Sequence, residues 1–289
     1  MLILLPPSET KAHGGDGPSL SELGGRVNCP FPEVRATSER LVRAIEHMGS
    51  YRSAKTRARS RSLLGLKDTQ DSELDYNARV RTSPTSPAIE RYTGVAYEAL
   101  DATGSRTGIS LGQPAIRRIA MGSALWGVVG AAEQIPYYRL SAGSKLLFPR
   151  RQQAVTLKNI WGSSITHALE EWCETMEEGG DAIFDFRSSG YAALGKIQGA
   201  VQLRVETEYP NGTRKVVSHF NKYYKGLAAR ELALLEDDIG AADAGDALAE
   251  VINHSPTFRG ETIRAEPTSN RGVTMIVPAA QQKKATELP

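Results

Sequence analysis

The spacing of apolar residues along the chain predicts both helices and buried strands. Apolar side chains at positions 34, 41, 45 and 48 recur near helical intervals and predict a helix over about residues 32–46. A second apolar stripe at intervals of three and four predicts one amphipathic helix over residues 157–176. Short apolar runs predict strands at residues 2–5, at 116–122, at 182–186 and near residue 274.

A β-hairpin is predicted over residues 201–220. Two runs with alternating and β-branched residues flank Asn211-Gly212, a dipeptide that favours the tight turn of a hairpin. A helix is expected to begin near Lys222, and the acidic, Ala- and Gly-rich residues 236–247 are expected to form a linker or surface loop. We expect one domain over residues 1–278 and a mobile tail over residues 279–289.

Composition and charge exclude several classes of protein. The 289 residues are 40% apolar with a net charge of +2, which is far from the strongly basic balance of a dedicated nucleic-acid module. Any nucleic-acid binding must therefore come from a local patch. Cys29 and Cys173 lie outside any metal-ligand spacing, so neither a disulfide framework nor a metal site is predicted. The apolar start stops at Pro6-Pro7, which argues against a signal peptide or membrane span, and we expect a cytoplasmic protein.

One segment carries a local excess of positive charge. Six basic residues fall in a short predicted helix and its turn: Arg52, Lys55, Arg57, Arg59, Arg61 and Lys67. Such a run is commonly a solvated surface helix, and the alternative is a patch that faces nucleic-acid phosphates. The following "LLGLKD" turn is compatible with a helix-hairpin-helix, although the second glycine of that motif is missing.

Polar residues follow the apolar runs in a way that predicts one shared cleft. The runs continue into the segments that begin at Pro7, Ser123, Arg187 and Asn221. Ligands gather where strand ends meet helix N-termini, because free N–H groups and the helix dipole favour anions there. Lys222 and Lys225 beside Asn221 predict a phosphate or carboxylate site with aromatic walls, whereas Ser188 and Ser189 are equally suited to helix capping.

Catalytic signatures of the common enzyme classes are absent from the sequence, including the P-loop and the nucleophile elbow. His219 is a candidate general base or a ligand of haem or another metal, and the alternative is a hydrogen-bonded structural histidine. Glu9 near Lys11 is either an acid/base pair or a surface ion pair. A haem or iron cofactor held by His219 or His167 is a further hypothesis, and the cofactor is otherwise unknown.

Six separated stretches together resemble the YaaA proteins, also called the DUF328 or UPF0246 family, which are peroxide-stress proteins of bacteria. They occur in the family's order over residues 1 to about 235 and are "MLILLPPSETK", "RYTGVAYEAL", "GSALWGVV" followed by "IPYYRLSAG", "IWGSSIT", "FRSSGYAAL" and "VVSHFNKYYKGLAAREL". The N-terminal block is similar to the actinobacterial branch, and Glu9 stands where the better-studied branch has a lysine before the threonine.

The resemblance implies a single mixed α/β domain with a mixed sheet flanked by helices, a basic cleft and a helix-hairpin-helix-like element within residues 41–80. It also implies DNA binding and a role in limiting damage from peroxide and intracellular iron. The implied cleft residues are Ser8, Thr10, Lys11, Arg139, Trp161, Ser189, Tyr191, Asn221, Lys222 and Lys225.

Two functions follow as hypotheses. The first is an oxidative-stress protein that binds DNA through the basic segment and the cleft. The second is an enzyme acting on a nucleobase, nucleotide or similar small aromatic substrate, in a specialised pathway and with or without haem, because aromatic residues accompany the cleft. His219, Glu9 and Tyr191 are its candidate catalytic residues, with Lys222 as a further acid, base or ligand.

Overall fold

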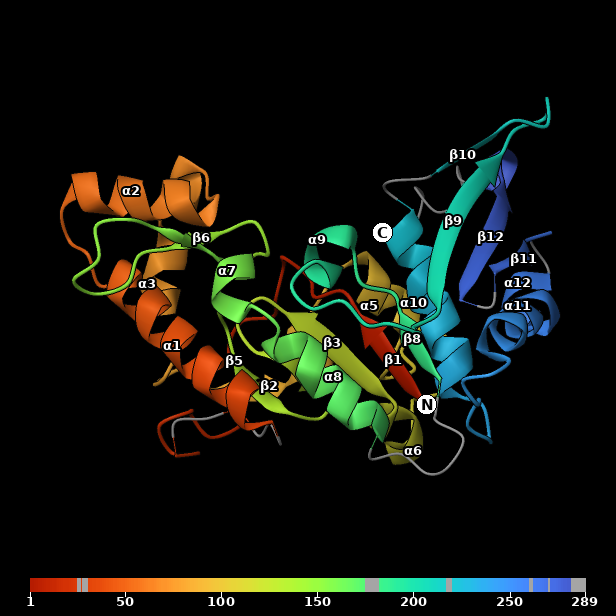
Figure 1. Cartoon of the computed structure of the whole chain (residues 1–289), viewed down its shortest axis with the longest axis horizontal. Helices are drawn as coiled ribbons and strands as arrows, with labels where there is room; N and C mark the ends of the chain where they lie inside the picture. Colours follow the sequence, from red (N-terminus) through yellow and green to blue (C-terminus); the bar gives the residue numbers. More distant parts are fainter. Residues whose placement is uncertain are drawn as a thin grey trace.

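Two four-stranded sheets and the helices packed against them form the computed structural model shown in Figure 1. The structure describes residues 1–24, 27, 31–174, 182–216, 220–259, 262–269 and 271–281. Helices and strands are mixed along the whole chain, so the predicted α/β class is confirmed. Cys29, His219 and residues 282–289 of the expected tail lie outside the described residues, as does the side chain of Cys173.

The first sheet brings three parallel strands to a common edge. Its order is β4-β3-β1-β8, and the strands are β1 (Leu2–Leu5), β3 (Ile119–Ser123), β4 (Gly127–Gly130) and β8 (Ile183–Asp185). Strand β1 is central and parallel to both β3 and β8, while β4 is antiparallel to β3. All four residues of β1 are buried, which explains a run without polar alternation. The carboxyl ends of β1, β3 and β8 meet at one edge, as the polar continuations of these three runs predict.

A helical lobe stands at the left of Figure 1. It consists of α1 (Pro32–Gly49), α2 (Ala54–Leu64), the 3₁₀ turn η1 (Asp68–Gln70) and α3 (Ser72–Ala78). Helix α2 begins after Ser53, whose Oγ accepts a hydrogen bond from the backbone N–H of Thr56 at 3.2 Å. It ends at Gly65, which adopts a left-handed conformation with φ of 70°. The segment is therefore helical as predicted, but a helix-hairpin-helix motif is not confirmed.

Further helices and short strands occur between residues 85 and 192. They are β2 (Thr85–Pro87), α4 (Ala88–Arg91), α5 (Val95–Leu100), α6 (Gln113–Arg117), β5 (Gln134–Pro136), β6 (Lys145–Leu146), β7 (Val155–Thr156), α7 (Leu157–Trp161), α8 (Ser164–Glu174) and α9 (Ser189–Ala192). Strands β2 and β5 pair antiparallel, as do β6 and β7.

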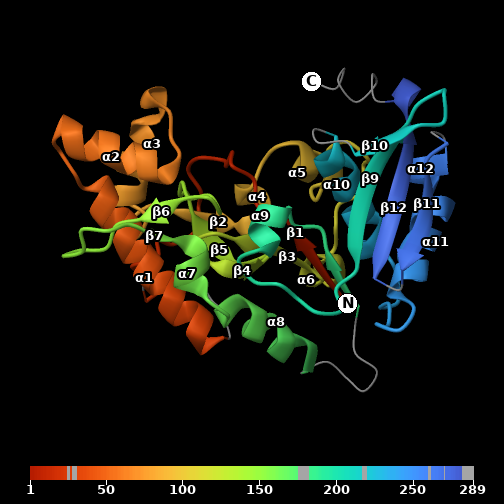
Figure 2. The ribbon, with the colours of Figure 1, turned by 45° about the horizontal axis from the view of Figure 1, so that its top comes forward.

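The second sheet lies at the other side of the molecule, and Figure 2 shows α10 between the two sheets. Its order is β10-β9-β12-β11, with β9 (Gln202–Glu208), β10 (Arg214–Val216), β11 (Arg264–Ser269) and β12 (Gly272–Pro278). The helices on this side are α10 (Asn221–Ala233), α11 (Ala244–His254) and α12 (Pro256–Arg259). Strands β9 and β10 pair antiparallel around the Asn211-Gly212 turn, and β12 is the last strand, so both predictions are confirmed. Helix α10 contacts β1 and β9.

Three predicted boundaries are wrong. The single helix over residues 157–176 is two helices, α7 and α8, because Gly162 between them adopts a positive φ of 56°. The strand expected from residue 116 begins only at Ile119, since a proline in the first turn starts the short helix α6 over residues 113–117. The expected linker over residues 236–247 already contains the start of α11 at Ala244. Within the described part of the chain, every helix is too short or too polar to cross a membrane.

Candidate functional site

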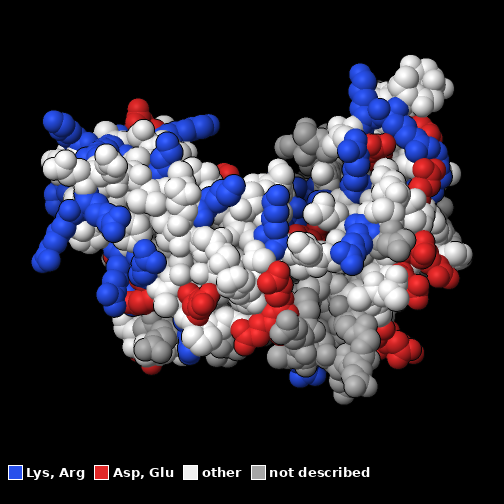
Figure 3. Space-filling view, in the orientation of Figure 1, with Lys and Arg blue, Asp and Glu red and all other residues white. Residues whose placement is uncertain are grey.

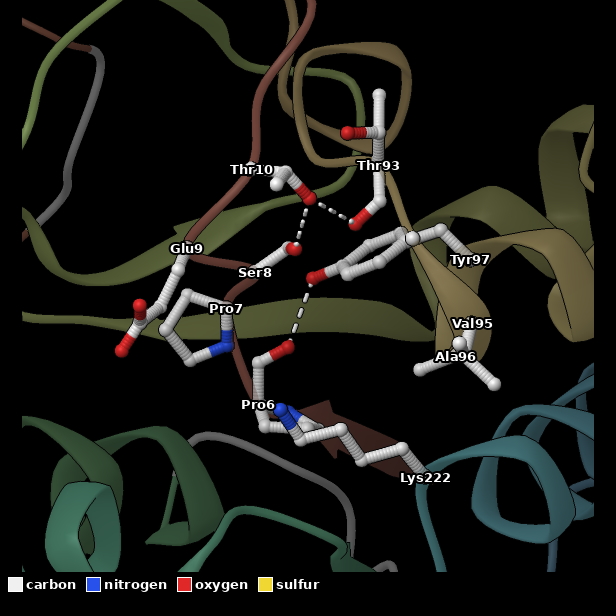
Figure 4. Close-up of a pocket in the computed structure, with 11 residues that line it drawn as sticks. Pro6, Pro7, Ser8, Glu9, Thr10, Thr93, Val95, Ala96, Tyr97 and Lys222 are labelled. Carbon is white, nitrogen blue, oxygen red and sulfur yellow. Dashed lines mark hydrogen bonds between the residues drawn. The ribbon is translucent and has the colours of Figure 1, made fainter. Parts of the chain in front are cut away.

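A pocket of about 330 Å³ opens at the carboxyl end of β1 (Figure 4). The loop after β1 forms one wall, the start of α5 forms another, and Lys222 of α10 closes the third side. Its lining residues are Pro6, Pro7, Ser8, Glu9, Thr10, Thr93, Gly94, Val95, Ala96, Tyr97 and Lys222. Gly94 has φ of 96°, and a Cβ there would lie 3.3 Å from the hydroxyl oxygens of both Ser8 and Thr10. The structure thus brings together Ser8, Glu9, Thr10 and Lys222, four of the predicted residues.

Hydrogen bonds fix the pocket walls to one another. The hydroxyl groups of Ser8 and Thr10 lie 3.0 Å apart. The Tyr97 hydroxyl donates to the carbonyl oxygen of Pro6 at 2.9 Å and so ties α5 to the loop after β1. Because these side chains are held by each other, the pocket has a defined shape in the structure.

Lys11 lies behind the pocket loop rather than in the pocket lining. Its ammonium donates to the carbonyl oxygen of Ser8 at 3.0 Å and lies 4.4 Å from the ring centroid of Tyr138. Burial, followed by the charge of Arg139, lowers the pKa of Lys11 from 10.5 to about 7. This lysine therefore exchanges a proton close to neutral pH.

We expect the Lys11 side chain to titrate with a midpoint near pH 7 in the folded protein. The pKa in the unfolded chain is the higher one, so folding releases a proton, and the contribution of Lys11 to stability rises as the pH increases from about 7 to about 10.5. NMR of carbon-13-labelled lysine, assigned with Lys11→Arg, measures the midpoint. A Lys11 midpoint above pH 10 would contradict the buried placement.

A chain of hydroxyl groups lies beside Lys11. Ser123 Oγ accepts the backbone N–H groups of Leu125 and Trp126 at 3.2 and 3.1 Å, so its own proton is free to be donated. Its oxygen lies 2.8 Å from the Tyr138 hydroxyl, which lies 2.7 Å from that of Tyr92. Burial raises the pKa of Tyr92 to about 12, so this hydroxyl stays protonated at neutral pH. Ser123 begins one of the polar segments that the sequence analysis assigned to the cleft, and Tyr138 lies in the block "IPYYRLSAG". The sequence analysis missed Tyr92, although it falls in the block "RYTGVAYEAL".

Glu9 and Arg139 form an ion pair beside the pocket. Arg139 Nη2 donates to Glu9 Oε2 at 2.9 Å, and Nη1 donates to the Glu9 carbonyl oxygen at 2.7 Å. Asn77 of α3 makes two hydrogen bonds with the backbone of Arg139. The predicted partner of Glu9 was Lys11, and the structure gives it Arg139 instead.

Helix α9 carries two further predicted residues. Ser189 is exposed at its start, and burial raises the pKa of Tyr191 above its ordinary value. Ser188 occupies the N-cap position of α9, although its side chain makes no capping hydrogen bond.

A buried ion pair lies at the end of β8, and its carboxylate acts on the charge of Lys225. Arg187 donates to both carboxylate oxygens of Asp185 at 2.8 Å, and both side chains are almost fully buried. Lys225 Nζ donates to the carbonyl oxygen of Phe186 at 3.2 Å. Burial lowers the pKa of Lys225 to about 8, and the charge of Asp185 opposes that shift. The sequence analysis named Arg187 as the start of a polar segment and missed its partner Asp185.

Other predicted residues do not line the pocket. Trp161 is 1% exposed, and its indole nitrogen donates to the Ala124 carbonyl oxygen at 3.0 Å, so it belongs to the core. The amide oxygen of Asn221 is buried without a hydrogen-bond partner among the described residues. His167 is largely exposed, with Nδ1 3.7 Å from a Glu33 carboxylate oxygen. Among the described residues, no three His, Cys, Asp or Glu side chains are placed to hold a metal ion.

The six basic residues in and around α2 differ in their partners. Arg57 pairs with Asp71 and Asp75, and Arg61 pairs with Asp68 and Asp71, so these two arginines hold α2 against the following turn and α3. Arg59 is exposed and donates to the Gln152 carbonyl oxygen at 2.8 Å. The remaining three, Arg52, Lys55 and Lys67, are exposed and form no ion pair within the described part of the chain. We call these three residues the α2 patch.

The surface between the helical lobe and the second sheet is hollowed, as Figure 3 shows. Lys and Arg side chains gather over α2 and on both walls of the hollow. The charge is therefore distributed unevenly, although the net charge of the chain is only +2.

Comparison with known proteins gives consistent matches. The family described as "Peroxide stress protein YaaA" matches residues 1–240. A UPF0246 protein of Corynebacterium glutamicum is 37% identical over 278 residues, which cover 96% of this chain and 100% of that protein. A UPF0246 protein of Corynebacterium efficiens is 44% identical over 81% of this chain and 85% of its own length. One from Streptomyces coelicolor is 35% identical over 80% of this chain and 82% of its own.

Proposed function

The chain belongs to the family of the peroxide stress protein YaaA, and from this membership we propose that it is an oxidative-stress protein that binds DNA through the α2 patch and the adjoining hollow. The family description supports the stress role. The observation that carries DNA binding is the α2 patch itself, three exposed cations without carboxylate partners in the described chain. Cations of this kind attract phosphates and release the counterions condensed on DNA.

The internal pairing within the helical lobe supports the same proposal. Arg57 and Arg61 form ion pairs with the carboxylates of Asp68, Asp71 and Asp75 on the neighbouring turn and helix and offset most of their charge. These carboxylates would otherwise repel a phosphate backbone, so the pairing leaves the α2 patch as the local excess of charge.

We expect Lys55→Glu to weaken binding of a short fluorescein-labelled duplex about tenfold at low salt, because a phosphate contact becomes a repulsion. The matched control is Arg117→Glu, which reverses an exposed charge on α6 and should change affinity less than twofold. Fluorescence anisotropy measures both. Equal effects of the two variants would show that binding does not depend on the α2 patch.

A second candidate function is an enzyme that acts on a small aromatic or phosphate-bearing molecule. The observation that favours it is the pocket of about 330 Å³, which is lined by the hydroxyl groups of Ser8 and Thr10 and by Lys222. Nearby Lys11 has a pKa of about 7, which suits proton transfer at neutral pH. An absorbance spectrum and a native mass spectrum of freshly purified protein test it. A bound nucleobase, nucleotide or haem that is lost in Lys222→Ala would support this function, and a protein that carries none and whose melting temperature is unchanged by a nucleotide panel would contradict it.

A further inference from the structure

Three aromatic rings form a cluster between the pocket loop and α3. His13 stacks on Tyr137 with ring centroids 4.1 Å apart and an interplanar angle of 16°. Tyr76 of α3 lies 4.8 Å from His13 and 4.9 Å from Tyr137. If Tyr76 covered the far face of His13, its centroid would lie much further from Tyr137, at about the sum of the two His13 distances. Tyr76 therefore flanks the stacked pair and does not cover the outer face of His13, which is an exposed residue.

Tyr137, the ring on which His13 stacks, is held in place by burial and a hydrogen bond. Tyr137 is 7% exposed, and its hydroxyl donates to the Glu73 carboxylate at 3.0 Å. Two residues further along the chain, the backbone of Arg139 is held by Asn77. A flat ring held in this way loses little conformational entropy when another ring stacks on it.

The charges around the cluster suit a nucleic acid. Arg79 is exposed, with its guanidinium 5.7 Å from the centroid of the Tyr76 ring. The carboxylate of Asp75 is paired with Arg57, that of Glu9 with Arg139, and that of Glu73 accepts the hydrogen bond from the Tyr137 hydroxyl. Helix α3, which carries Tyr76 and ends just before Arg79, packs against α2, the helix that carries Lys55 of the α2 patch.

We propose that His13, flanked by Tyr76, stacks an unpaired base of a single-stranded nucleic acid while the α2 patch binds the adjoining phosphates. The proposal rests on the proposed DNA-binding function and names the part of the ligand that this surface recognises. A stacked base inside a duplex has no free face to offer, whereas every unpaired base does, so the site favours single strands without selecting a sequence.

The test uses an oligonucleotide with one 2-aminopurine, both as a single strand and as the matching duplex. We expect His13→Ala to lower single-strand affinity about tenfold and to abolish the quenching of 2-aminopurine fluorescence, with duplex affinity unchanged. His13→Phe should restore both single-strand properties because it restores a flat ring. The control is His254→Ala, an exposed histidine on α11.

The outcomes separate this inference from the proposed function. If His13→Ala binds the single strand as tightly as wild type while Lys55→Glu binds it weakly, the stacking site is wrong and DNA binding through the α2 patch stands. If wild type binds neither oligonucleotide, both proposals fail. Loss of single-strand and duplex affinity to the same extent in His13→Ala would also overturn the stacking site, because a stacked base should matter only for the single strand.

Discussion

Asp185→Ala is expected to lower the free energy of unfolding by about 3–5 kcal/mol, the largest effect of any substitution that we predict. The change leaves the guanidinium of Arg187 buried without its carboxylate. Arg187 cannot reach water easily, because its side chain passes over Gly122 of β3 and also donates to the Gly195 carbonyl oxygen at 2.8 Å. Chemical denaturation followed by circular dichroism measures the loss.

The control for Asp185→Ala is Glu266→Ala, which removes a partner of Arg214 on the exposed second sheet. An exposed pair of this kind contributes about 0–1 kcal/mol, so the control should stay near wild type. The same Asp185 variant should lower the pKa of Lys225 further below about 8, because the opposing carboxylate charge is gone. Equal stability losses in the two variants would contradict the buried ion pair.

Gly226→Val is expected to lower the free energy of unfolding by about 1–3 kcal/mol through overpacking. Helix α10 crosses α5 so closely that a Cβ at Gly226 would lie 2.2 Å from the Ala96 carbonyl oxygen and 2.8 Å from the Ala99 Cβ. Since α10 carries Lys222 and α5 forms the opposite pocket wall, the same shift should widen the pocket. Thermal and chemical unfolding measure the effect.

A double variant identifies which contact is responsible for the Gly226→Val effect. Adding Ala99→Gly removes the methyl contact but leaves the backbone oxygen of Ala96 in place. We therefore expect at most partial recovery of stability. Full recovery would show that the side chain of Ala99, and not the backbone of α5, limits the approach of α10.

The sequence predicts three of the four strands of the first sheet, β1, β3 and β8, because their apolar runs are short, buried and bounded by polar residues. The hairpin is predicted because Asn211-Gly212 has the local chemistry of a tight turn. The division of residues 157–176 into two helices is not predictable from the apolar stripe, which continues through Gly162. A single positive φ interrupts the backbone without changing the periodicity of the side chains.

Polar residues that follow a buried strand are predictable for the same local reason, and Ser8 and Thr10 after β1 line the pocket. Ion pairs between residues far apart in the sequence are not predictable in this way. Arg139 pairs with Glu9 because the fold places the segment after β5 beside the loop after β1, and the sequence interval between them carries no sign of this contact. Likewise, residues 52–67 show six positive charges in sequence, and only the fold shows that Arg57 and Arg61 are paired with carboxylates.

The most direct test of DNA binding through the α2 patch is the salt dependence of the duplex affinity of wild type and Lys55→Glu. Each phosphate contact contributes about −0.9 to the slope of log affinity against log salt. The α2 patch predicts a wild-type slope of about −3 or steeper, with a slope shallower by about 1 in Lys55→Glu. A wild-type affinity that does not change with salt, or an identical slope in the two proteins, would contradict phosphate binding by these residues.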